Sequence, residues 1–173
     1  MPHHIVATAL YEIPSLSEHP LLKAVVGGWR LGLLQTVQSG SLFTVTTTAN
    51  TTNAFPAGPL RPNVVGEPEL PASERTLSRW FNTTAFQNSA ALTFGNSPRS
   101  VLRGPRLFTT DLTLEKHIPI RGSTQIDIRA ELYNLLNNVN LNPPGATLGA
   151  ADFGVISSAR SARTVQLGAR LSF

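Results

Sequence analysis

The stretch TVQLGARLSF, residues 164–173, places an apolar side chain at every second position. The apolar set is Val165, Leu167, Ala169, Leu171 and Phe173. Because successive side chains of a β-strand point to opposite faces, this spacing predicts a strand with one wholly apolar face. The sequence then stops on an aromatic residue, where a soluble domain usually has a polar, frayed end. We therefore expect the last side chain to matter.

Four further segments alternate in the same way, and we predict strands near residues 4–13, 29–39, 111–118 and 124–133. The segment 124–133 is the clearest, since Asp127, Arg129 and Glu131 fall on one face and only apolar residues on the other. This pattern fits a soluble sandwich strand with its charged face in water. It fits equally a membrane barrel strand with its charged face toward the lumen.

The connections between these segments favour the barrel. A tight turn, PIRGS, joins the third and fourth segments, whereas residues 40–110 and 134–163 form long loops. Unstructured loops longer than about 15 residues are uncommon in compact domains. Outer-membrane barrels have short periplasmic turns and long extracellular loops, and with the last strand running toward the periplasm both long loops fall outside. We predict an all-β fold, an antiparallel up-and-down transmembrane β-barrel segment.

Composition narrows the function classes. Charged residues make up 14% of the chain and hydrophobic residues 41%, which suits a surface that meets something other than water on one side. A net charge of +4 without a basic run argues against a nucleic-acid partner. The absence of cysteine excludes a disulfide framework and Cys-based zinc sites. No apolar run reaches the roughly 18 residues of a transmembrane helix, and we expect the export signal to lie outside this sequence.

Aromatic and helical features are few. We assign Tyr11, Trp29 and Tyr133 to an aromatic girdle at the membrane interfaces. Lys116 falls on the apolar face near the inner end of its strand, from which its ammonium could reach the interface. Short helices are expected only within residues 15–28 and 73–81.

The residues that could carry chemistry have simpler interpretations. His3 and His4 are adjacent, so on a strand they would point to opposite faces and could not share a metal ion. The charged residues of segment 124–133 suit a luminal charge ladder better than an acid–base pair. Three loop arginines, Arg99, Arg103 and Arg106, are candidate contacts for an anionic ligand. We find no nucleophile motif and predict no enzyme activity, no metal site and no cofactor.

Several motifs together resemble one family. The stretch GWRLGLLQTVQSGSLFTV, residues 28–45, resembles a strand near the C-terminus of TonB-dependent outer-membrane receptors of the Oar-like, carboxypeptidase-regulatory-domain-containing type. RPNVVG, RWFNTTAF and GNSPRSVLRGP are similar to loop segments of that family. DLTLEKHIPI, IDIRAELYNLLNNVNLNPP and FGVISSARSARTVQLGARLSF are similar to its last strands. Ser41 and Leu42 depart from the family pattern, which has proline at the second of these positions.

The resemblance implies a function and a set of partners. Residues 1–173 would be the C-terminal part of a barrel of about 22 strands. The expected partners are outer-membrane lipid, the remainder of the barrel and its plug domain, the outer-membrane assembly machinery, and TonB through an N-terminal part. The assembly machinery would read the alternating residues that end in Phe173. The whole protein would import a scarce or large ligand, although this part alone would not transport. The alternative is a soluble, secreted β-sandwich or adhesin-like binding module.

Overall fold

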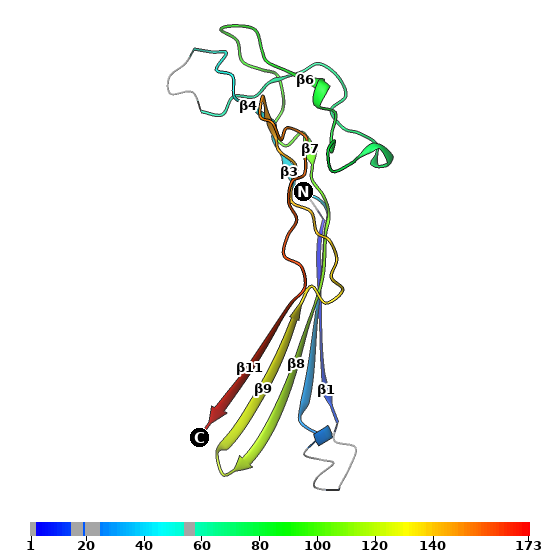
Figure 1. Ribbon diagram of the computed structural model, residues 1–173, viewed down its shortest axis with the longest axis vertical. Helices are drawn as coiled ribbons and strands as arrows, with labels where there is room; N and C mark the ends of the chain where they lie inside the picture. Colours follow the sequence, from blue (N-terminus) through cyan, green and yellow to red (C-terminus); the bar gives the residue numbers. More distant parts are fainter. Residues whose placement is uncertain (1–2, 15–18, 20–24, 54–57) are drawn as a thin grey trace. The chain divides into compact units, whose positions relative to one another are not determined.

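The computed structural model describes residues 3–14, 19, 25–53 and 58–173, and its chain divides into two compact units (Figure 1). The sheet unit comprises His3–Gln38, Leu107–Val139 and Ser161–Phe173. The loop unit comprises Ser39–Arg106 and Asn140–Arg160. Within the described ranges, none of the helices has the length and apolar character needed to cross a membrane.

The sheet unit is a single antiparallel sheet with the strand order β1-β2-β8-β9-β11 (Figure 1). Its strands are β1 (His4–Ile13), β2 (Trp29–Gln38), β8 (Leu107–Arg121), β9 (Thr124–Tyr133) and β11 (Thr164–Ser172). Each strand of the sheet pairs with the next one along the chain, which is the up-and-down arrangement predicted from the sequence. Gly122 has a φ of +60° in the β8–β9 turn, a conformation that glycine adopts without strain.

All five predicted strands are present, and the largest difference concerns β8. The prediction gave residues 111–118, whereas β8 runs from Leu107 to Arg121. The added start of the strand pairs with β2, where Leu107 lies opposite Gln38 and Thr110 lies opposite Gln35. The hydroxyl of Thr110 also donates a hydrogen bond to Oε1 of Gln35 at 2.6 Å. Cross-strand contacts such as this one extend β8 beyond the segment in which apolar and polar residues alternate, so the alternation alone did not reveal the start of the strand.

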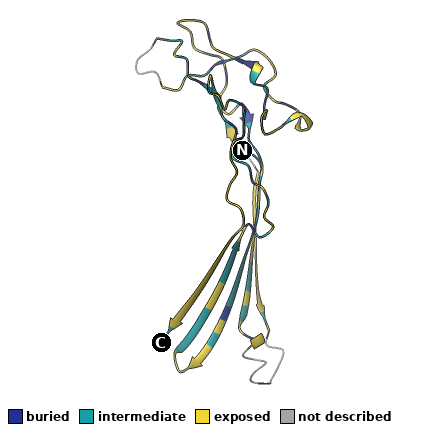
Figure 2. Ribbon diagram, in the orientation of Figure 1, coloured by how far each residue is buried: buried dark blue, intermediate teal, exposed yellow. Residues whose placement is uncertain are grey.

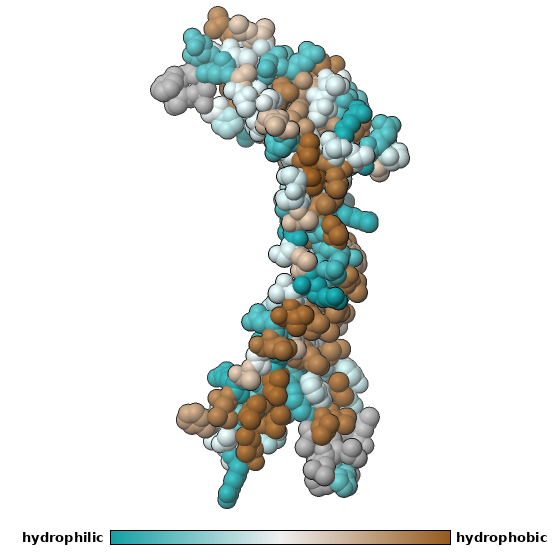
Figure 3. Space-filling view, in the orientation of Figure 1, coloured by the Kyte–Doolittle hydropathy of each residue, from teal (hydrophilic) through white to brown (hydrophobic). Residues whose placement is uncertain are grey.

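The register of the sheet sorts its side chains onto two faces. One cross-strand row joins Tyr11, Leu31, Leu114, Ala130 and Leu167. The neighbouring row, on the opposite face, joins Glu12, Arg30, Glu115, Arg129 and Gly168. Because strand side chains alternate, a slip of one residue at any pair would mix these two faces. Figure 3 shows hydrophobic side chains along the strands of the sheet.

The loop unit contains short pieces of secondary structure. Its strands are β3 (Leu42–Phe43), β4 (Thr46–Thr47), β5 (Asn63–Val64), β6 (Phe86–Gln87), β7 (Leu102–Arg103) and β10 (Thr147–Leu148). Two 3-10 helices, η1 (Ala72–Glu74) and η2 (Thr83–Ala85), complete it. Strands β3 and β7 pair antiparallel, as do β5 and β6, whereas β10 pairs with β4 in parallel. The last pairing joins the two long connections of the chain.

An aromatic core holds the loop unit together. Phe81 is 1% exposed, and its ring lies 5.2 Å from that of Phe153 and 5.8 Å from that of Phe86, both edge-on. Edge-to-face ring pairs of this kind add to the stabilisation from burial. The remaining buried members of the cluster are Val45, Ala85 and Leu102. Residues 40–110 and 134–163 are therefore largely a folded unit, and treating them as plain loops was incomplete.

The helix expected within residues 73–81 was wrong. The structure has only η1 there, preceded by Pro71, and Arg75 already has an extended ψ of 126°. Further along, the backbone N–H of Trp80 donates to the carbonyl oxygen of Gly154 at 2.9 Å. This hydrogen bond ties the backbone of Trp80 to a distant part of the loop unit, which a helical backbone at this position would not allow. Most of the other expected helix, residues 15–28, lies outside the described residues.

Burial differs sharply between the two units (Figure 2). Among the described residues, every buried hydrophobic side chain belongs to the loop unit: Val45, Leu70, Phe81, Ala85, Phe86, Leu102 and Ile156. Apart from Gly27, the buried residues in the described part of the sheet unit are polar or charged: Thr110, Lys116 and Asn134. In the described part of the sheet unit, no layer therefore covers the apolar face, unlike a sheet of a soluble sandwich.

Candidate functional site: the charged face of the sheet

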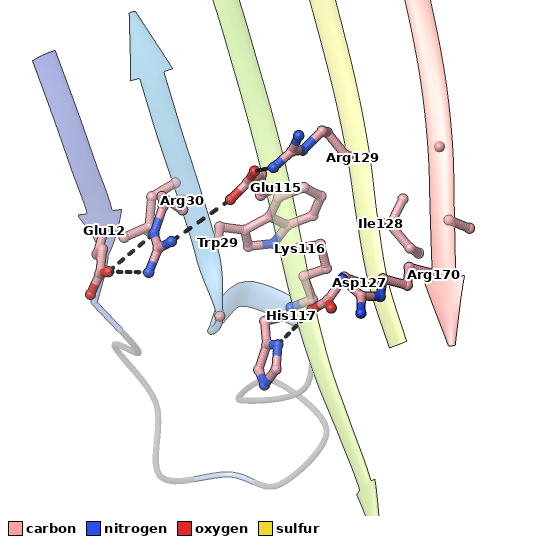
Figure 4. A pocket seen from close by; sticks show the side chains of 14 residues that line it. Glu12, Trp29, Arg30, Glu115, Lys116, His117, Asp127, Ile128, Arg129 and Arg170 are labelled. Carbon is pink, nitrogen blue, oxygen red and sulfur yellow. Dashed lines mark hydrogen bonds and ion pairs between the residues drawn. The ribbon is translucent and has the colours of Figure 1, made fainter. Parts of the chain in front are cut away.

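A row of alternating charge crosses four strands of the sheet (Figure 4). Nε and Nη2 of Arg30 donate to Oε1 of Glu12 at 3.1 and 2.7 Å. Nη1 of Arg30 lies 3.8 Å from Oε2 of Glu115, and Arg129 binds the other oxygen of that carboxylate. We call Glu12, Arg30, Glu115 and Arg129 the charged row. Each charge in it has an opposite charge on a neighbouring strand, the arrangement that stabilises cross-strand pairs.

A second group of titratable residues lies closer to the β8–β9 turn. Nδ1 of His117 lies 2.7 Å from Oδ1 of Asp127. Asp127 is the register partner of Arg170 on β11, so this group also spans neighbouring strands. Both groups line one hollow of about 720 Å³ on the sheet (Figure 4). Its polar contacts are largely exposed, so these pairs can exchange partners with a group that enters the hollow.

Tyr133 lies at the other end of the same face. Its hydroxyl donates to Oε2 of Glu131 at 3.0 Å, so the ring shares the face of the charged residues. A girdle residue is expected on the lipid side, and this placement of Tyr133 differs from that expectation. Tyr11 and Trp29, in contrast, lie on the apolar face, opposite Leu31 and Lys116 respectively.

The charged face also carries exposed apolar side chains. Val6, Leu10 and Leu34 lie on β1 and β2 at positions that alternate with the apolar face, and all three are exposed. Leu10 is 74% exposed and lies over Gly32, where an added Cβ would come within 3.3 Å of its Cδ2. We call these three residues the luminal apolar patch. A second hollow of about 430 Å³ includes Leu10 and Leu34 together with Glu131 and Tyr133.

Lys116 occupies the apolar face without reaching open water. Its ammonium donates to the carbonyl oxygens of Val25, at 3.1 Å, and of Gly27. It also lies 5.2 Å from the ring centroid of Trp29, whose indole N–H donates to the same Val25 oxygen at 2.9 Å. At 6% exposure the side chain is buried against residues 25–29, and the expectation that its charge reaches the interface stays a prediction. Its charge is satisfied by backbone carbonyls and an aromatic face.

The three loop arginines have different surroundings in the loop unit. Nη1 of Arg103 donates to the carbonyl oxygen of Gly40 at 3.0 Å, and its own carbonyl accepts the indole N–H of Trp80 at 2.9 Å. Arg103 therefore holds the fold of the loop unit. Arg99 and Arg106 are exposed. A ligand contact by these residues stays a prediction.

One comparison with known proteins identifies the family. A family profile described as an outer membrane beta barrel domain matches residues 1–166. The chain belongs to this family. It is therefore an outer-membrane protein, and the apolar face of its sheet meets membrane lipid, since barrel strands alternate apolar-out and polar-in. The charged row and the luminal apolar patch then face the lumen.

No protein with curated annotation and no solved structure matches the chain. The match ends at Gln166, so the assembly-signal role of the last residues, Val165, Leu167, Ala169, Leu171 and Phe173, stays a prediction.

Sequence reasoning found the members of the charged face on β9 but missed the row across the sheet. The row depends on Glu12, Arg30 and Glu115 lying at matching register positions on strands far apart in the chain. The signal available was a charged residue on the polar face of each of the first three predicted strands, near the end that leads into or out of a short connection: Glu12, Arg30 and Glu115. Pairing those strands in order would have placed the charges side by side.

Proposed function

We propose that this chain is part of a TonB-dependent outer-membrane transporter of the Oar-like type that imports a scarce or large ligand. The motifs described above carry the resemblance, and the family match supplies the outer-membrane barrel. The observation that favours a transporter over an open channel is the luminal apolar patch. The lumen of a water-filled porin is polar, whereas barrels that contain a folded plug cover their inner wall with protein.

The side chains of the luminal face are suited to contact with a folded plug domain. Exposed apolar residues such as Leu10 lose contact with water when a folded domain packs against them. The charged row beside them is already neutralised strand by strand, so a polar partner can dock without leaving an unpaired charge behind. We also propose that the chain has no catalytic role, and that the ion pairs of the charged row serve to position a partner.

The soluble sandwich alternative has less support. Its inner face would pack on a second sheet, and in the described part of the sheet unit no second sheet is present. Exposure of the β11 side chains, Leu167 among them, fits contact with lipid instead.

The test uses the complete outer-membrane protein that contains this chain. Purified in detergent and inserted into planar lipid bilayers, it should show no steady conductance, and it should bind the isolated periplasmic domain of TonB in a pull-down. A matched control replaces Glu69, an exposed residue of the loop unit, with Ala and should behave identically. A steady open-channel conductance, or no binding to TonB, would overturn the proposal.

A further inference from the structure

The second hollow, of about 430 Å³, adjoins the charged row on the luminal face of the sheet. Its centre lies on strands inside the sheet, where Leu34 of β2, Asp111 of β8 and Tyr133 of β9 line it. Gly32 lines it too, and a Cβ there would come within 3.3 Å of Leu10 and narrow the space. Hollows of about 300–1,000 Å³ that combine apolar walls with a few polar groups are the usual form of a small-molecule site.

Two carboxylates in this hollow have no cation to themselves. Oδ1 of Asp111 accepts the backbone N–H of Asn134 at 2.8 Å, and no ion pair among the described residues includes Asp111. Oε2 of Glu131 accepts the hydroxyl of Tyr133 at 3.0 Å, while Oε1 lies 3.5 Å from Nη1 of Arg129. That arginine is bound more closely by a glutamate of the charged row. The two like charges create a negative potential that attracts a cation into the hollow.

The neighbouring side chains do not supply that cation. The charged row contains two arginines and two glutamates, so its charges cancel within the row (Figure 4). Within the described strands, the luminal positions farther from the β8–β9 turn than this row include no lysine or arginine. Asp111 and Glu131 therefore leave two negative charges in excess on this part of the face.

The apolar and aromatic walls of the hollow indicate which kind of cation fits. Leu34 and the ring of Tyr133 are exposed, and the hydroxyl bond to Glu131 holds the ring beside a carboxylate. Aromatic faces attract ammonium and guanidinium groups, and apolar surface accommodates the methylene stems that carry them. A metal ion would need several oxygen ligands, and among the described residues no group of three acidic or histidine side chains is placed to bind one.

We infer that this hollow is a binding subsite for an organic cation, an ammonium or guanidinium group on an apolar stem. The cation belongs either to a solute in the lumen or to a lysine or arginine side chain of protein packed against the wall, and the recognising chemistry is the same. The inference rests on the luminal position of this face, which follows from the barrel family. It does not depend on TonB, so this inference and the transport proposal can fail separately.

A solute is tested with the complete outer-membrane protein in detergent, by saturation-transfer NMR. Butylguanidinium is the probe, and butylurea, which has a similar shape without the charge, should not bind. Asp111→Asn and Glu131→Gln keep the oxygen atoms that accept bonds from Asn134 and Tyr133 but remove the charges. Each should weaken binding of the probe about tenfold. Glu69→Gln, the same change at an exposed position of the loop unit, should leave binding unchanged.

A protein side chain is tested in cells with a benzophenone amino acid at Leu34, and captured peptides are identified by mass spectrometry. In this case butylguanidinium does not bind, and the captured peptide carries a lysine or arginine at the crosslink. Replacing that residue with Met should lower the unfolding midpoint as much as Glu131→Gln does, with no further loss when the two changes are combined. Probe binding that the amide variants or butylurea leave unaltered, or neither probe binding nor a captured lysine or arginine, would overturn the inference.

Discussion

Phe81 is the residue whose loss should damage the loop unit most. It is 1% exposed and makes ring contacts with Phe43, Phe86 and Phe153. Replacing a buried phenylalanine with alanine costs about 3–5 kcal/mol, because apolar burial is lost and a cavity remains. With a urea dependence of about 2 kcal/mol per molar, F81A should lower the unfolding midpoint of this unit by roughly 2 M.

The distribution of tryptophan makes this measurable. The chain has two tryptophans, and Trp29 lies in the sheet unit while Trp80 lies in the loop unit. In a W29F background, in detergent, the fluorescence of Trp80 reports the loop unit alone. F94A is the matched control, since Phe94 is 76% exposed in the same unit and its loss should cost within about 0.5 kcal/mol. Equal midpoints for F81A and F94A would refute the assignment of the core.

Four shorter predictions concern both units. L167R places a charge on the lipid face and should lower the free energy of unfolding by about 2–4 kcal/mol near mid-membrane, whereas Q166R on the luminal face should be tolerated. Heat-modifiable mobility on gels compares the stability of the two variants. Equal losses would contradict the assignment of faces. Deletion of Phe173 in the complete protein should lower its surface level, measured by cell-surface labelling, and a normal level would argue against an assembly signal. G154A should destabilise the loop unit by about 1–3 kcal/mol, because Gly154 has a φ of +83° and a Cβ there would meet Thr83. The Trp80 fluorescence assay measures the loss. An unchanged unfolding midpoint would contradict the prediction. K116M keeps the aliphatic part of the Lys116 side chain but removes its hydrogen bonds to the carbonyls of Val25 and Gly27. The fluorescence emission of Trp29 should therefore shift to the red in a W80F background. An unchanged emission would show that the ammonium does not hold this contact.

The sheet could be predicted closely because each of its strands keeps a local period. The predicted segments 4–13 and 124–133 coincide with β1 and β9. Alternation fixes both the position of a strand and the face of each residue, whatever lies beside it. That same alternation already placed Tyr133 with Asp127 and Glu131, so its assignment to a lipid-facing girdle overlooked a signal that the sequence contained.

The loop unit could not be predicted in this way because its contacts are not local. Phe81 and Phe153 meet although a strand hairpin separates them in the chain, and β4 pairs with β10 across the same interval. Such contacts leave no periodic pattern in the sequence, because β4 and β10 have two residues each and are too short to show alternation. The charged row was missed for a related reason, since its members become neighbours only once the register of the sheet is known.

The interleaving of the chain through the loop unit has a consequence for biogenesis. Residues Ser39–Arg106 precede the β8–β9 hairpin, and residues Asn140–Arg160 follow it. Phe153 can reach Phe81 only after both strands of that hairpin have been synthesised, because the hairpin lies between the two residues in the chain. The aromatic core is therefore completed late, when nearly the whole chain is present.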